Sequence, residues 1–293
     1  MKLCLYYFSG TLNTEHVAKA LQKEWGEEAR LFRIGWPFAG IPDPNDYDMI
    51  GIGYPIHAFN TPKVVLDFFR QFPRAKKPKD YFIFKTSGEP LHFNDCSSRK
   101  LIYRLKKKGY SCVQEFDYIM PYNMVFRHSD GMAKKMWVYA EKISAFNLAK
   151  VKQGIVERPR FRPLQGWYIV PFRIEWPFIK TNGRHFRIDD QKCIHCGTCI
   201  KVCPMANVTM DGGKIHFGGR CTLCMACSFS CPENAIKPGM FFGAWIINGS
   251  YQLERLEKDP QVIMPKASHE PHFNKAYDHY FADCDALLAR GVK

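Results

Sequence analysis

Eight cysteines between residues 193 and 231 carry the clearest chemical signal in this sequence. They form two runs of one spacing: two residues separate the first three cysteines, three precede the fourth, and a proline follows directly. This is the spacing of thiolates that hold two [4Fe-4S] cubanes. The first run is Cys193, Cys196, Cys199 and Cys203, and the second is Cys221, Cys224, Cys227 and Cys231.

The shape of a cubane divides each run into a triplet and a fourth cysteine. A chain that curls around a cluster can place three thiolates at its corners, whereas the Cys-Pro step turns the chain away, so that the fourth cysteine reaches the other cluster. We therefore expect Cys231 to complete the cubane of the first triplet, and Cys203 that of the second. This crossing requires the two clusters to lie close together.

Zinc and disulfides are the competing interpretations of these cysteines. A structural zinc site uses two Cys-x2-Cys pairs or a mixture of cysteine and histidine, which leaves the third cysteine of each triplet and both prolines unexplained. Disulfide frameworks are typical of short secreted chains, and this chain has 293 residues. The pattern favours cubanes. The other four cysteines lie in no metal spacing and are expected to be buried thiols: Cys4, Cys96, Cys112 and Cys284.

The segment from about residue 184 to 240 resembles the bacterial two-cluster ferredoxin family, on its eight cysteines and two Cys-Pro steps. The resemblance implies a small α+β domain with two [4Fe-4S] clusters. Thiolate ligands and exposed cubanes fit a reducing interior, so we expect a cytoplasmic protein of an anaerobic or low-oxygen setting.

Length, composition and net charge limit the classes of protein to which this chain can belong. The chain is long enough for two domains, and its 46% hydrophobic and 24% charged residues are ordinary for a soluble globular protein. No apolar run approaches the roughly 20 residues of a membrane span. The net charge of +14 suits an acidic protein partner, an anionic cofactor or plain solvation. The basic residues are dispersed, which disfavours nucleic acid.

A short apolar run at residues 2 to 8 predicts a strand buried on both faces. Ser9, Thr11 and Thr14 follow it, and a helical pattern begins there. A small polar loop between a strand and a helix start presents backbone N–H groups to an anion, although the same residues could simply cap the helix.

Further strands are predicted at 31–34, 48–53, 81–86 and 112–120, with helices at about 62–72, 97–108 and 131–152. This alternation predicts an α/β fold with a doubly wound parallel sheet. Gly51-x-Gly53 only half fits a dinucleotide fingerprint, because Ile56 stands where the third glycine belongs.

The N-terminal half resembles flavodoxin, whose phosphate loop runs Ser/Thr-x-Thr-Gly-Asn-Thr. Residues 9–14 read Ser-Gly-Thr-Leu-Asn-Thr, so Leu12 replaces the usual glycine, which we expect to be tolerated if its φ is negative. The resemblance implies the five-strand order 2-1-3-4-5 and FMN at the switch point between the first and third strands. Its phosphate would contact Ser9, Thr11, Leu12, Asn13 and Thr14.

The resemblance also implies that two more loops hold the isoalloxazine ring. Tyr54, His57 or Phe59 would stack on the ring or flank it. Alternatively, His57 is a surface residue or transfers protons, and Phe59 packs in the protein interior. Asn123, after the fifth strand, is a ligand contact or a turn residue. The loops comprise Tyr54, Pro55, Ile56, His57, Ala58, Phe59 and Asn60 after the third strand, and Thr86, Ser87 and Gly88 after the fourth.

Four segments follow from these patterns: 1–155, flavodoxin-like; 156–183, a proline-rich connection; 184–240, ferredoxin-like; and 241–293, an extension. Trp167 and Trp176 suggest a connection packed between the domains, with substrate binding as the alternative. The run at 241–247 is too short for a membrane span. A terminal helix with an apolar stripe, from Phe273 to Leu288, is expected to dock on the chain itself.

The whole chain resembles flavodoxin-ferredoxin fusion proteins. This implies an electron-transfer protein that passes single electrons between two clusters, FMN and a redox protein partner, such as an acidic ferredoxin or an oxidoreductase. A ferredoxin-dependent flavin reductase acting on a small organic substrate is the alternative. A third possibility is that the flavodoxin-like domain has lost its flavin and docks a ferredoxin. The electron donor and acceptor and the oligomeric state stay open.

Overall fold

The structure is a computed structural model that describes residues 1–159, 167, 170–171, 183–237, 239 and 249–292. Most of the predicted connection, with Trp176, and the apolar run at 241–247 lie outside the described residues. Trp167 is described and is 76% exposed. The predicted packing of this connection between the domains stays a prediction.

Five parallel strands form the main sheet in the order β2-β1-β3-β4-β5. This confirms the predicted flavodoxin-like topology, with strand ends shifted by no more than two residues. Continuous apolar runs bury β1 on both faces, as parallel strands under helices require. The strands are β1 (Leu3–Tyr7), β2 (Ala29–Arg33), β3 (Met49–Pro55), β4 (Lys79–Ser87) and β5 (Tyr110–Ile119).

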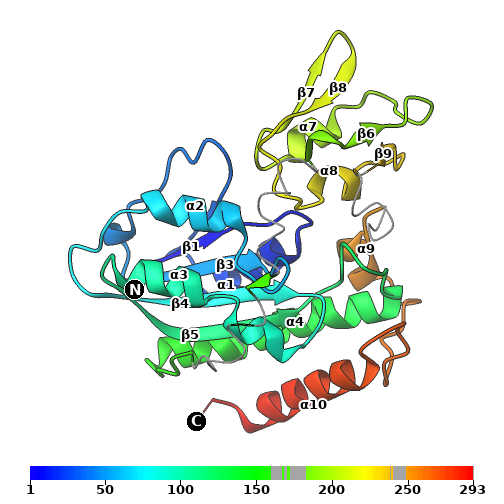
Figure 1. The fold of residues 1–293 in the computed structure, drawn as a ribbon. Helices are drawn as coiled ribbons and strands as arrows, with labels where there is room; N and C mark the ends of the chain where they lie inside the picture. The colour runs from blue at the N-terminus through cyan, green and yellow to red at the C-terminus, as the bar shows by residue number, and fades with distance from the viewer. Residues whose placement is uncertain (160–166, 168–169, 172–182, 238, 240–248, 293) are drawn as a thin grey trace.

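Helices cover both faces of this sheet (Figure 1). On one face lie α1 (Asn13–Trp25) and α4 (Asp130–Lys152), which share a core with Leu5 and Phe84. On the other lie α2 (Lys63–Gln71) and α3 (Arg99–Lys106), which pack over Tyr6 and Ile83. The predicted helix at 97–108 is preceded by a 3-10 turn, η2 (His92–Cys96); another, η1 (Pro44–Asp46), precedes β3.

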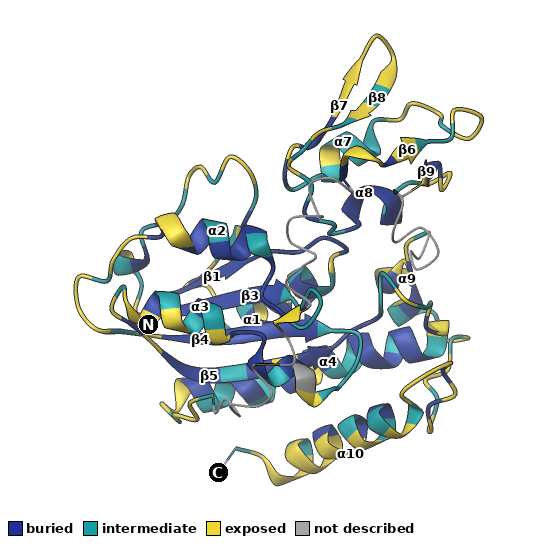
Figure 2. Cartoon of the chain, viewed as in Figure 1, coloured by how far each residue is buried: buried dark blue, intermediate teal, exposed yellow. Residues whose placement is uncertain are grey.

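The cysteine-rich segment forms a small α+β unit at one end of the molecule (Figure 1). Two antiparallel pairs frame it, β6 (Arg187–Ile188) with β9 (Ile236–Lys237), and β7 (Val208–Asp211) with β8 (Lys214–Phe217). Two short helices, α7 (Thr198–Val202) and α8 (Ala226–Phe229), begin within the two cysteine triplets and contain the third cysteine of each. Figure 2 shows that α8 is buried whereas the β7–β8 hairpin is largely exposed.

The C-terminal extension returns to the flavodoxin-like unit through α9 (Leu253–Lys258) and α10 (Asn274–Arg290). Helix α10 lies along α4 (Figure 1) and buries Tyr277 and Phe281 against Met132 and Met136. The predicted docking of the terminal helix is confirmed at its centre, whereas Phe273 and Leu287 are exposed. In the described part of the chain, no helix is both long and apolar enough to span a membrane.

Candidate functional site

The structure divides the eight cysteines between two cavities, and it does so across the runs. The first, named here the outer cavity, measures about 370 Å³ including the part open to solvent. Its wall contains the first triplet and the fourth cysteine of the second run, with apolar neighbours such as Ile188 and Ile236. The four cysteines in its wall are Cys193, Cys196, Cys199 and Cys231.

The second, named here the inner cavity, measures about 340 Å³ on the same basis. Phe186, Met205 and Phe217 line it together with the second triplet and the fourth cysteine of the first run. The four cysteines in its wall are Cys203, Cys221, Cys224 and Cys227. Both groupings match the crossed sets that the Cys-Pro steps predict.

The pKa shifts of the cysteines follow the same grouping. Burial raises the pKa of Cys199, and the neighbouring Cys231 and Cys193 add to the rise. In the inner cavity, burial raises the pKa of Cys227, and the neighbouring Cys224, Cys221 and Cys203 raise it further. Like charges disfavour one another's thiolates at close range. The raised pKa values favour neutral thiols, and a cation among the four sulfurs would be needed to hold them as thiolates.

The two cavities differ in their exposure. Cys196 is exposed, and the side chain of Thr198 holds its pKa below the usual range. In contrast, burial raises the pKa of Cys221 to about 11 and that of Cys224 to about 12. A group in the outer cavity therefore faces solvent, and a group in the inner cavity sits in a less polar environment.

Backbone donors reach the sulfur of each fourth cysteine in an equivalent way. Asn207 donates its N–H to Cys203 Sγ at 3.3 Å, and Ala235 donates to Cys231 Sγ at 3.3 Å. Each donor lies four residues after its cysteine, so the two runs fold alike. Such bonds stabilise thiolates and tune cluster potentials. Among the described residues, no three His, Cys, Asp or Glu side chains converge tightly enough for a single metal ion; the sulfurs line cavities instead.

The loop between β1 and α1 has the donors of an anion site. Ser9, Thr11 and Thr14 are buried. Within the described residues, the backbone N–H groups from Ser9 to Leu12 have no acceptor. Buried N–H groups are almost always paired in proteins, and here they precede a helix whose dipole favours negative charge. This donor set fits a phosphate group.

Leu12 departs from the expectation stated above. Its φ is 71°, in the left-handed region, rather than negative. The loop thus keeps a backbone conformation that glycine adopts freely and a leucine adopts at a cost. Its side chain is 49% exposed, so it points away from the protein interior.

Side chains of the loop join it to the ends of β4 and β5. The Thr14 and Thr86 hydroxyls lie 2.8 Å apart. Asn123 donates to Thr11 Oγ1 at 3.3 Å, and Asn13 donates to the Pro121 carbonyl at 2.8 Å. The structure therefore brings together three of the predicted loops at the carboxyl edge of the sheet, and it places Asn123 in contact with the loop between β1 and α1.

The structure places the residues predicted to hold the ring after the third strand partly in the core and partly at the sheet edge. Tyr54 lies inside β3, which ends at Pro55, and is completely buried in the core. Its ring therefore does not face the sheet edge and cannot stack on a ligand there. His57 and Asn60 exchange backbone hydrogen bonds at 3.0 and 2.9 Å, with Ala58 and Phe59 at positive φ between them, as in a type I′ turn. The remaining residues, Pro55, Ile56, His57, Ala58 and Phe59, are partly exposed at the edge.

His57 packs edge-on against the Phe8 ring, with 6.4 Å between ring centroids. Burial lowers its pKa to about 4. It is therefore neutral near pH 7 and is a poor candidate for a proton donor.

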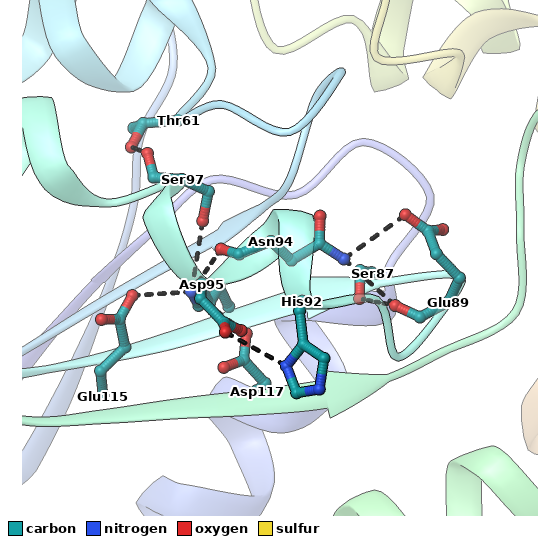
Figure 3. A network of polar contacts seen from close by, with 10 residues as sticks. Thr61, Ser87, Glu89, His92, Asn94, Asp95, Ser97, Glu115 and Asp117 are labelled. Atoms are coloured by element: carbon teal, nitrogen blue, oxygen red, sulfur yellow. Dashed lines mark hydrogen bonds and ion pairs between the residues drawn. The ribbon is translucent and has the colours of Figure 1, made fainter. Parts of the chain in front are cut away.

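A polar network supports the loop after β4 (Figure 3). Ser87 Oγ donates to the Glu89 carbonyl at 2.9 Å, and Asn94 Nδ2 donates to the same oxygen at 3.1 Å. The buried Lys85 donates to the Asn94 carbonyl at 2.9 Å and pairs with Glu115 at 2.8 Å. The turn at Thr86 to Gly88 is thus fixed to η2 and to β5. Its composition gave no sign of this support.

The inner cavity adjoins the loop between β1 and α1 directly. A Cβ atom on Gly10 would lie 2.2 Å from the carbonyl oxygen of Cys224, so only glycine allows this approach. Trp36 donates its backbone N–H to the Pro204 carbonyl at 2.7 Å. Cys203 and Cys224 both pack against the core beneath α2 and α3. No pattern in the sequence marked this junction.

Sheet order and cysteine arrangement together define a class: a flavodoxin-like α/β unit joined to a segment of iron-sulfur type. A family model described as a 4Fe-4S binding domain matches residues 185–209. None of the curated proteins compared with the chain matches it.

Several solved flavoproteins are similar to the N-terminal half. A flavoprotein in complex with FMN from Lactobacillus acidophilus is 16% identical, covering 40% of this chain and 92% of that one, with a TM-score of 0.31. Megasphaera elsdenii flavodoxin is 21% identical over 39% and 84%, with a TM-score of 0.33. Flavodoxin 1 from Bacillus cereus is 18% identical over 51% and 98%, with a TM-score of 0.36. These likenesses are weak, and the fold assignment rests on the sheet order.

Proposed function

We propose that this chain is an electron-transfer protein with two [4Fe-4S] clusters and FMN. Cubanes exchange single electrons, and a flavin accepts one or two, which adapts one-electron carriers to two-electron chemistry. Cys193, Cys196, Cys199 and Cys231 would hold the outer cubane, and Cys203, Cys221, Cys224 and Cys227 the inner one.

FMN is assigned on the donor set of the phosphate loop. The backbone N–H groups from Ser9 to Leu12, which have no acceptor in the part of the chain that the structure describes, suit a phosphate. The edge residues after β3 and the turn at Thr86 to Gly88 would hold the ring. Tyr54 is left out of this set because its side chain is buried.

The observation that carries the proposal is the backbone contact between Gly10 and Cys224. It joins the loop that would hold the FMN phosphate to a ligand of the inner cubane. Electron exchange between them would then need no diffusional encounter. The order of carriers along the molecule is outer cubane, inner cubane and flavin.

The outer cavity would exchange electrons with the redox partner. Cys196 is exposed, and the neighbouring Ile194 is 61% exposed. Lys192 and Lys201 flank this surface and are exposed. Apolar contact surrounded by basic residues suits a partner with an acidic surface.

Anaerobic purification with iron, sulfide and flavin quantified per chain tests the proposal. About eight iron atoms and one FMN are expected. Four iron atoms or fewer, or zinc in their place, would contradict the two-cluster assignment. Eight iron atoms without flavin would restrict electron transfer to the clusters and make the flavodoxin-like unit a docking module.

A further inference from the structure

Helix α10 reaches the turn after β4 through a buried hydroxyl. Tyr277 has no exposed surface. Its hydroxyl donates to the Gly88 carbonyl at 2.7 Å. The two residues are 189 positions apart in the sequence. The C-terminal extension therefore contacts a loop that is assigned to the flavin ring.

His128 orients this hydroxyl. The Tyr122 backbone N–H donates to His128 Nδ1 at 3.2 Å, so that nitrogen is an acceptor and the ring proton resides on Nε2. Nε2 lies 3.0 Å from the Tyr277 oxygen and donates to it. The tyrosine proton is then free to point at Gly88. Burial lowers the pKa of His128 to about 3, which keeps the ring neutral.

The other side of Gly88 is closed by Tyr122. A Cβ atom on Gly88 would lie 2.2 Å from the Tyr122 ring. That ring stacks on His128 with 5.3 Å between centroids, and its hydroxyl donates to the Glu89 carboxylate. The carbonyl groups of Thr86 and Ser87 are likewise engaged, by the Ile56 and Met120 N–H groups. Each carbonyl of the turn thus has a fixed direction.

We propose that Tyr277 is a positioning residue of the flavin site, which makes α10 a part of that site. The inference rests on the proposed FMN binding. With its carbonyl held by Tyr277, the peptide between Gly88 and Glu89 has one orientation, because the C=O and N–H of a trans peptide point in opposite directions. Loss of the hydroxyl leaves a partly buried carbonyl without its donor and lets this peptide turn.

The test compares Tyr277→Phe with Tyr280→Phe in the full cluster-loaded chain. Tyr280 lies on the same helix, and its hydroxyl accepts from the Ile119 N–H at 3.3 Å, away from Gly88. FMN is removed and titrated back by fluorescence, and the flavin midpoint potentials are measured. Tyr277→Phe is expected to weaken FMN binding about tenfold and to shift the potentials. Tyr280→Phe is expected to stay within about twofold of the unmodified chain.

A milder variant keeps the test informative if Tyr277→Phe does not fold. His128→Gln keeps an N–H donor for Tyr277 and is expected to fall between the unmodified chain and Tyr277→Phe in FMN affinity. Equal affinities and potentials in all variants, or equal losses in Tyr277→Phe and Tyr280→Phe, would overturn the positioning role. An unmodified chain that binds no FMN would instead refute the flavin assignment, and this inference with it.

Discussion

Gly10 lies so close to Cys224 that any side chain would overlap the cysteine's carbonyl oxygen. The loop between β1 and α1 and the loop that carries the second cysteine triplet thus share one interface. Under the proposed function, this contact would make the chain a continuous electron path from the exposed cysteines to the sheet edge.

Gly10→Ala tests this interface. Gly10 is not among the residues at positive φ, so alanine fits its backbone and the effect is steric. We expect about 1 to 3 kcal/mol of destabilisation and slower electron exchange between clusters and flavin, measured by thermal denaturation and by absorbance after rapid reduction. Gly218→Ala, whose nearest contact would be 3.2 Å, should have a smaller effect. Equal effects would count against the interface.

Leu12→Gly is expected to stabilise the protein. A leucine in the left-handed region costs about 1 to 2 kcal/mol, and the substitution removes this cost. Glycine has more conformational freedom in the unfolded chain, which offsets the gain by about 0.5 to 1 kcal/mol. The net gain is about 0.5 to 1 kcal/mol in the free energy of unfolding. Leu287→Gly, at a similarly exposed leucine inside α10, should be destabilising. A loss at Leu12 would contradict the strained conformation.

The ion pair beneath the turn after β4 is tested by Lys85→Met. Lys85 and Glu115 are both buried, and Asp117 lies 3.3 Å from Lys85. Removal of the lysine leaves buried negative charge uncompensated, with an expected loss of about 3 to 5 kcal/mol in chemical denaturation. The double variant Lys85→Met/Glu115→Leu should lose less. If the double variant is the less stable of the two, the pair is not the cause.

Three histidines with lowered pKa values, His16 and His128 in the interior and His57 partly exposed, predict a loss of stability in mild acid. Burial lowers the pKa of His16 and His57 to about 4 and that of His128 to about 3. The unfolded chain protonates them near pH 6.5, so the free energy of unfolding falls as the pH drops from about 6.5 towards 4. Each contributes a slope of up to about 1.4 kcal/mol per pH unit.

His16→Gln isolates one of these contributions. Glutamine can keep the contact of His16 Nε2 with the Trp137 carbonyl, 3.3 Å away. We expect the slope of unfolding free energy against pH to become shallower by up to about 1.4 kcal/mol per pH unit. His279→Gln, at an exposed position on α10, serves as the control. An unchanged slope in His16→Gln would show that His16 is not buried as described.

Local sequence patterns predicted the fold well because strand burial and cysteine spacing depend on residues that are close in the sequence. The apolar run before Ser9 predicted β1, and the spacing from Cys193 to Cys231 predicted which cysteines share a cavity. Tyr54 was misjudged because β3 extends to Pro55, two residues beyond the predicted strand end, so Tyr54 lies inside the strand with its side chain in the core. The contacts of Gly10 with Cys224 and of Tyr277 with Gly88 join distant segments, and no periodicity encodes them.

The most direct test of the account is to compare Cys203→Ser with Cys231→Ser, each purified anaerobically. Both should keep about four iron atoms. Cys203→Ser should retain the outer cubane, which an external chelator bleaches quickly and which does not exchange electrons with flavin. Cys231→Ser should retain the inner cubane, slow to bleach and coupled to flavin. The reverse result, with Cys203→Ser retaining the protected, flavin-coupled cluster, would contradict the crossed arrangement.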